Sequence, residues 1–232
     1  MKLTVLGLLL VATLTNGRAQ SCLGVPFKPG MQFELTTFDA KDRSTGKILY
    51  QVKDVRKAGG STLMDINAQF QDERGNQREP YVIQYTCTGN ELIADLSGMT
   101  QAMQNTGGKN TTLKLKTNRL VYPGPLSVGQ KLPDGQMDAD VLANGSTMVE
   151  MSMTMSNRQV DGQEKLTTPA GTFDTYKVTS DMQFTNRAMG IPIRGTMHIV
   201  SYRTNSLIFD VKTETYNKNG KLMGYTLLSK AY

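Results

Sequence analysis

The sequence predicts an all-β protein, an antiparallel barrel or half-barrel of about 10–12 strands with one short helix. The first observation is that apolar and polar residues alternate over most of the 232 residues, as in antiparallel strands with one buried and one wet face. The second is that turn pairs rich in Gly, Asn and Asp separate these stretches. The third is that helical spacing occurs in a single segment.

Residues 1–19 have the pattern of a secretory signal peptide. An apolar run from Leu3 to Leu14 is too short to span a bilayer, and the small residues Gly17 and Ala19 precede the expected cleavage site. No later stretch approaches the roughly 18 consecutive apolar residues of a membrane helix. We therefore expect a periplasmic or secreted protein, with a single barrel-like domain over residues 20–232 and no transmembrane segment in the mature chain.

The chain has two cysteines, Cys22 and Cys87, and an exported protein meets conditions in which disulfides persist. A bridge between them is the favoured interpretation, because it would tether an N-terminus that otherwise frays. Two unpaired buried thiols are the second interpretation. Lipidation of Cys22 ranks third, because Ala19 stands three residues before it, where lipoprotein signals usually carry a larger aliphatic residue.

The alternating pattern predicts about a dozen strands. They centre on residues 31–35, 48–52, 64–70, 81–87, 92–94, 113–115, 137–141, 149–155, 176–184, 197–199, 207–211 and 223–227. The turns expected between them include residues 59–60, 75–76, 144–145, 161–162 and 219–220.

Helical spacing is found at Leu96, Met99 and Met103, which predict a helix over residues 96–105 that ends before the glycines at 107–108. Such a helix could plug or cap a barrel. It could equally pack on a sheet edge as a short surface helix. The sequence leaves both interpretations open.

The first and last predicted hairpins resemble each other. Residues 33–52 and 209–225 both begin with an aromatic, an acidic and an aliphatic residue. Each then has a further aromatic residue, followed by Gly-Lys-aliphatic and a tyrosine. In an antiparallel meander two such hairpins can lie side by side and close the sheet, which removes exposed edges. The similarity therefore favours closure.

The charge distribution argues against nucleic-acid binding. Removal of Lys2 and Arg18 with the leader lowers the formal net charge from +6 to +4. The basic residues form no block and are not interleaved with aromatic residues, so the chain lacks the footprint of a nucleic-acid-binding protein.

No catalytic, cofactor or metal signature stands out. The one histidine, His198, lies between two apolar residues of a predicted strand, and nothing selects a serine and a carboxylate for a triad. Residues 107–111 lack the spacing of a phosphate-binding loop, and one histidine with two cysteines is too few for a zinc site. Several carboxylates lack the glycine and terminal Glu of a calcium loop, namely Asp39, Asp42, Asp134, Asp138 and Asp140. We therefore expect a non-enzymatic protein without a cofactor.

Methionines alternate at Met151, Met153 and Met155. Thioethers suit copper(I), but residues two apart on a strand are roughly 6.6–6.8 Å apart, which hinders shared coordination. Core filling accounts for the pattern best, followed by an adaptable apolar lining for a ligand, and then by copper.

A lining is physically reasonable because a barrel of about 8 strands is filled by its own side chains, whereas about 10–12 strands leave interior space unless the barrel flattens. The candidate lining residues are Met151, Met153, Met155, Tyr176, Met182, Phe184 and Met197. The preferred hypothesis is an exported, non-enzymatic envelope protein that holds an apolar or amphiphilic, lipid-like molecule in its lumen. The alternative is a structural or assembly module that binds an envelope protein through its outer surface, and a hydrolase ranks third.

Four stretches carry a resemblance to a known family. They are residues 122–134 (Tyr-Pro-Gly-Pro-Leu-Ser-Val-Gly-Gln-Lys-Leu-Pro-Asp), 168–178 (Thr-Pro-Ala-Gly-Thr-Phe-Asp-Thr-Tyr-Lys-Val), 209–211 and 216–222. Through them the chain resembles the TapB-like family of exported bacterial proteins, common in Bacteroidetes. The resemblance implies an all-β, barrel-like envelope protein and carries over no catalytic residues.

Overall fold

The computed structural model describes residues 20–89, 91–95, 111–188 and 190–232, and these residues form strands and no helix. A short hairpin, β1 (Gln20–Cys22) and β2 (Val25–Phe27), precedes twelve longer strands. The twelve are β3 (Gln32–Asp39), β4 (Ser44–Ala58), β5 (Ser61–Asp72), β6 (Tyr81–Cys87), β7 (Glu91–Asp95), β8 (Thr111–Pro123), β9 (Gly135–Ala143), β10 (Ser146–Thr168), β11 (Gly171–Ala188), β12 (Ile191–Arg203), β13 (Lys212–Asn217) and β14 (Leu222–Ala231).

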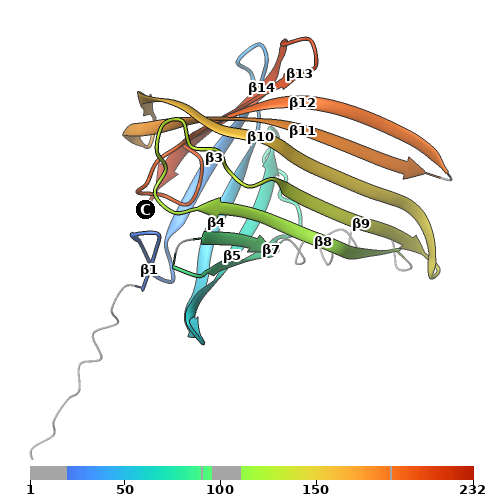
Figure 1. Cartoon of the computed structure of the whole chain (residues 1–232), viewed down its shortest axis with the longest axis horizontal. Coiled ribbons are helices and arrows are strands. Elements are labelled where there is room, and N and C mark those ends of the chain that lie inside the picture. The colour runs from blue at the N-terminus through green and yellow to red at the C-terminus, as the bar shows by residue number, and fades with distance from the viewer. Residues whose placement is uncertain (1–19, 90, 96–110, 189) are drawn as a thin grey trace, which may run out of the picture.

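These twelve strands form a closed antiparallel barrel in which each strand pairs with the next along the chain (Figure 1). The predicted fold class is therefore confirmed. The long strands β10, β11 and β12 arch over one side of the molecule, and the β1–β2 hairpin lies at the end opposite the β11–β12 turn (Figure 1). The helix predicted over residues 96–105 and the signal peptide predicted over 1–19 lie outside the described residues.

The barrel closes between its first and last hairpins. Strand β14 pairs with β3 so that Leu228 lies opposite Leu35, as the similarity of the two hairpins predicts. On the outer face of this seam Glu34 accepts hydrogen bonds from Lys47 at 3.0 Å and from Lys230 at 3.3 Å. One carboxylate therefore links three neighbouring strands.

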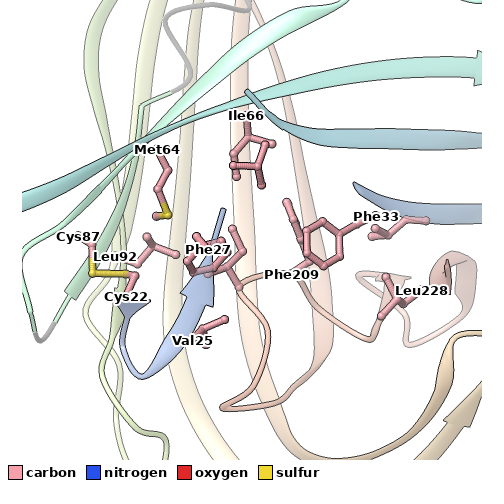
Figure 2. Packing of buried hydrophobic residues seen from close by; sticks show 13 residues of the cluster. Cys22, Val25, Phe27, Phe33, Met64, Ile66, Cys87, Leu92, Phe209 and Leu228 are labelled. Carbon is pink, nitrogen blue, oxygen red and sulfur yellow. A yellow bond between two sulfur atoms is a disulfide. The ribbon is translucent and has the colours of Figure 1, made fainter. Parts of the chain in front are cut away.

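The main apolar core fills one end of the barrel, around the β1–β2 hairpin. Val25 and Phe27 of β2 point into the barrel and pack among residues of the wall such as Met64 and Leu92 (Figure 2). The predicted bridge joins Cys22 of β1 to the end of β6, and the two Cα atoms are 5.8 Å apart. The hairpin thus plugs this end of the barrel and is tied to its wall. The buried members of the cluster are Cys22, Val25, Phe27, Phe33, Leu35, Val52, Met64, Ile66, Cys87, Leu92, Ile208, Phe209 and Leu228.

The strand predicted over residues 207–211 is wrong, because residues 204–211 form a loop and the strand follows as β13. Phe209 of this loop lies inside the plugged end and stacks on Tyr50, with ring centroids 4.4 Å apart, and tilts against Phe33 at 4.9 Å. The alternation of Leu207 and Phe209 therefore reflects packing into the core without strand pairing. Val211, just before β13, is bonded through its backbone to Tyr202 and Leu228.

The turn predicted at residues 161–162 is also wrong. Strand β10 continues through Asp161 and Gly162, and a register shift between Val160 and Gly162 marks a β-bulge. An extra residue in one strand bends it locally, which is what the arch of β10 requires here. A turn signal in the sequence thus corresponds to a bend within a strand.

A second, smaller cluster lies where residues 124–134 fold back against β10. Leu126 and Leu132 of this loop pack on Val160 and Val178, and backbone hydrogen bonds join Val160 to Gly129 and Gln130. The buried residues of this second cluster are Leu126, Leu132, Val160 and Val178. The loop therefore helps to cover the same plugged end.

Candidate functional site

The candidate lining residues of β10, β11 and β12 share the inner face of the barrel. Met182 and Phe184 follow the buried Val178 by four and six residues along β11, so alternation places all three on one face. Across the strands, Met182 pairs with both Met155 and Met197. The structure thus brings three methionines from three strands into one row.

The adjacent row contains Met153 and Phe184, which pair with each other, and Gly195 on β12. The ring of Phe184 lies directly over Gly195, because a Cβ atom placed on that glycine would be 2.2 Å from a ring carbon. Glycine is therefore required here for the ring to lie flat on the sheet. Met151, in the next row, pairs with Asn186.

These inner side chains are apolar yet none is buried. Met151, Met153, Met155, Met182, Phe184 and Met197 are all half-buried. By contrast Val160, nearer the plugged end on the same strand as three of them, is completely buried. The inner face therefore changes along β10 and β11 from a packed core to a surface that water reaches.

Tyr176 is separate from the other six candidates. It packs against the second cluster beside Val160 and Val178, and its partner on β12 is Arg203. Tyr176 therefore belongs to the covered end of the barrel, and the methionine-rich surface consists of the remaining six residues.

His198 lies on the outer face, as expected if Met197 and Ile199 face inward. It is half-buried and is paired with Asp181, whose Oδ1 is 3.1 Å from the histidine Nδ1. Asn157 donates a second hydrogen bond to Asp181, at 2.8 Å. Hydrogen bonds from Asn157 and then from His198 lower the pKa of Asp181 below its ordinary value of 3.8.

This histidine borders an open groove of about 580 Å³ on the outer face of β11–β13. The groove is lined by Lys177, Asp181, Thr196, His198, Val200, Tyr216, Asn217, Lys218 and Gly220. Sequence reasoning missed Asp181 as the partner of His198, because the two are opposite each other on neighbouring strands and 17 residues apart in the chain.

A second outer network joins β12, β13 and β14. Glu214 accepts a hydrogen bond from Tyr216 at 2.9 Å and from Lys212 at 2.6 Å. The Lys212 ammonium lies 5.7 Å from the ring centroid of Tyr202 and 5.3 Å from that of Tyr225. This part of the outer face therefore gathers three tyrosine rings beside charged neighbours; Tyr216 and Tyr225 are half-buried, and Tyr202 is buried.

Two largely buried arginines flank Tyr122 inside the plugged end. The guanidinium carbon of Arg203 is 4.1 Å and that of Arg158 is 5.5 Å from the Tyr122 ring centroid. Arg203 pairs with Asp210, whereas Arg158 donates to the carbonyl oxygen of Val121 at 2.9 Å. Burial lowers the pKa of Arg158 and raises that of Tyr122. These contacts brace the loop that closes this end.

Within the described ranges, no three His, Cys, Asp or Glu side chains lie close enough together to hold a metal ion. In the same part of the chain, no helix is long and apolar enough to cross a bilayer.

A family model described as DUF3108-like matches residues 28–228. No curated protein matches the chain. This match does not confirm the TapB-like name predicted from the four motifs. The expected barrel is confirmed by the strand pairing described above.

Two solved structures resemble the fold. A candidate lipoprotein from Parabacteroides distasonis is 21% identical, with a TM-score of 0.69, over 92% of this chain and 100% of that one. A candidate exported protein with a YmcC-like fold from Bacteroides fragilis is 20% identical, with a TM-score of 0.66, over 90% of this chain and 98% of that one. At this level of identity the likeness establishes the fold.

Proposed function

The chain belongs to the DUF3108-like family, and from that premise we propose that it is an exported, non-enzymatic envelope protein that holds an apolar or amphiphilic, lipid-like molecule against the inner face of its barrel. The observation that carries the proposal is the methionine-rich surface, defined as Met151, Met153, Met155, Met182, Phe184 and Met197, which faces inward and stays half-buried.

Covering this surface would be favourable. Apolar area removed from water contributes roughly 25 cal/mol per Å², so a bound acyl chain gains free energy from each side chain that it covers. Methionine is unbranched and flexible, and it adapts to ligands of irregular shape. Because the β1–β2 hairpin and residues 124–134 cover the opposite end, the molecule would enter beside the β11–β12 turn.

Export is supported by the two structural relatives, which are described as a candidate lipoprotein and a candidate exported protein. A lipid anchor on this chain's own Cys22 is not part of the proposal. Its sulfur is bonded to Cys87, and the same atom cannot also carry a thioether-linked lipid.

The experiment is to purify the protein, analyse it by native mass spectrometry, extract it with solvent, and then titrate the stripped protein with a fluorescent long-chain fatty acid. We expect a bound lipid-like molecule and saturable binding of the probe. The double variant Met155→Gln with Met182→Gln should weaken probe binding about tenfold, which corresponds to about 1.4 kcal/mol.

The matched control is Val128→Gln with Met223→Gln, because these side chains are 56% and 52% exposed and lie outside the methionine-rich surface. It should bind the probe as the wild type does. A wild-type protein that carries no extractable molecule and shows no saturable binding would refute the proposal, and equal loss in both double variants would show that the effect is not at the inner face.

The tyrosine-rich outer face of β12–β14 supports a second candidate function, that of an assembly module that binds an envelope protein. Tyrosines are enriched at protein interfaces, and the half-buried Tyr216 and Tyr225 are gathered there around Lys212 and Glu214. Crosslinked pull-down from envelope extracts with wild type and with Tyr216→Ala tests it. A partner that is captured equally by both proteins would argue against this face.

A further inference from the structure

The turn between β11 and β12 carries the most exposed large apolar side chain of the described chain. Ile191 is 69% exposed and Ile193 is 59% exposed, at the start of β12. Met148, at the start of the neighbouring strand β10, is 40% exposed. The β9–β10 and β11–β12 turns lie at the same side of the molecule (Figure 1). Three protruding apolar side chains are therefore presented together at this end.

These isoleucines continue the inner face of the barrel. Ile193 pairs with Asn186, which pairs in turn with Met151, and Ile191 pairs with Ala188, which pairs with Val149. Both isoleucines are thus on the same face of β12 as Met197. An apolar track, interrupted by Asn186, leads from the methionine-rich surface to the exposed turn.

Positive charge lies beside this track on the opposite face. Arg187 and Arg194 flank the turn and are both exposed. Arg187 has one ion pair, with Glu150 at 3.4 Å, and both side chains keep 51% of their surface exposed. In the ranges that the structure describes, Arg194 forms no ion pair. The turn therefore combines protruding apolar groups with available cations.

We propose that this turn docks on a phospholipid bilayer that contains anionic lipids, with Ile191 and Ile193 inserted among the acyl chains and Arg187 and Arg194 at the headgroups. Peripheral proteins bind membranes by this combination of buried apolar area and attraction to anionic lipid. The inference rests on the proposed function and deepens it, because docking here places the bilayer at the start of the apolar track. The membrane is then the source or the destination of the bound molecule.

A protein partner fits this feature less well than a bilayer. A stable protein interface buries about 800 Å² on each partner, usually as a complementary patch with a central anchor. Ile191, Ile193 and Met148 protrude from the tips of two hairpins and form a narrow apolar surface, too small for such a patch. A narrow apolar tip flanked by arginines suits shallow insertion into an anionic headgroup layer.

The test is flotation of the full mature chain with vesicles of phosphatidylethanolamine and phosphatidylglycerol, compared with vesicles of phosphatidylcholine. Wild type should float with the anionic vesicles, and less so in high salt. Ile191→Ser with Ile193→Ser should reduce the floated fraction at least fivefold. Arg187→Gln with Arg194→Gln should reduce it on anionic vesicles and abolish most of its salt dependence.

The matched control is Val128→Ser with Tyr232→Ser, which removes side chains that are 56% and 66% exposed near the plugged end. It should float as wild type does. Equal flotation of wild type and the isoleucine variant would overturn the proposal. So would an absence of flotation together with self-association, measured by light scattering, that the isoleucine substitutions abolish.

Probe titration separates this inference from the proposed function. If wild type binds the fatty acid but does not float, docking is refuted while the proposed function stands. If the isoleucine variant retains probe binding in solution but no longer floats, the turn acts in docking alone, as proposed. If wild type neither binds the probe nor floats, both are refuted.

Discussion

Removal of the Cys22–Cys87 disulfide tests how the plug is held in the barrel. The suitable change is Cys22→Ala with Cys87→Ala, because the two side chains are 1% and 3% exposed and a serine would place an unpaired hydroxyl in the apolar cluster. The two cysteines are separated by 65 positions in the chain. Cross-linking a loop of this length removes conformational entropy from the unfolded chain.

The expected loss follows from that separation. In the chain-entropy treatment the bridge contributes about 4.3 kcal/mol to the free energy of unfolding at 25 °C. Loss of the two buried sulfur atoms adds about 1 kcal/mol through poorer packing around Phe27 and Leu92. We expect the variant to be less stable by about 5 kcal/mol.

The assay is equilibrium unfolding in urea at pH 7, followed by circular dichroism, for wild type and variant with and without a reducing agent. Reduction should lower the stability of wild type toward that of the variant and leave the variant unchanged. A difference below about 1 kcal/mol between oxidised wild type and variant would refute the loop-closure argument for this chain.

Two further predictions concern the seam and the inner face. Glu34→Gln should cost about 1–2 kcal/mol at pH 7. Burial raises the pKa of Glu34, but hydrogen bonds from Lys47 and Lys230 outweigh burial and hold the pKa below 4.5. The loss of stability should therefore be full above about pH 4.5 and should disappear as the pH falls through the lower pKa of the folded state. Urea unfolding across this pH range measures it, and a loss that is unchanged at about pH 3 would contradict the argument. Gly195→Ala should lower the free energy of unfolding by about 1–3 kcal/mol, because the new methyl group displaces the Phe184 ring. Adding Phe184→Leu should restore part of the lost stability in thermal unfolding. If Gly195→Ala is as stable as wild type, the ring is not held in place by this glycine.

The strand pattern could be predicted from the sequence because a barrel wall has one apolar and one polar face. Eleven of the expected strands coincide with described strands, and the hairpin similarity correctly predicted closure. Failures occurred where apolar alternation had another cause. Phe209 alternates because it packs inside the barrel from a loop, and Gly162 marks a bulge within β10.

The candidate site could be predicted only in part. Alternation identified Met182 and Met197 as inward-facing, but their direct pairing depends on strand register, which no local pattern reveals. The same limit hid the pairing of His198 with Asp181. Tyr176 was grouped with the methionines because alternation gives the face of a residue and not its depth along the barrel.

The pairing of β14 with β3 also determines when the fold can be completed. It joins positions such as Glu34 and Lys230, which are 196 residues apart, so closure requires the last strand of the chain. Contacts of such long sequence separation are slow to form, and until then β3 and β13 both present unpaired edges. While the last strand is unpaired, these two edges are open to pairing with other chains, so we expect aggregation to compete with folding before closure and not after it.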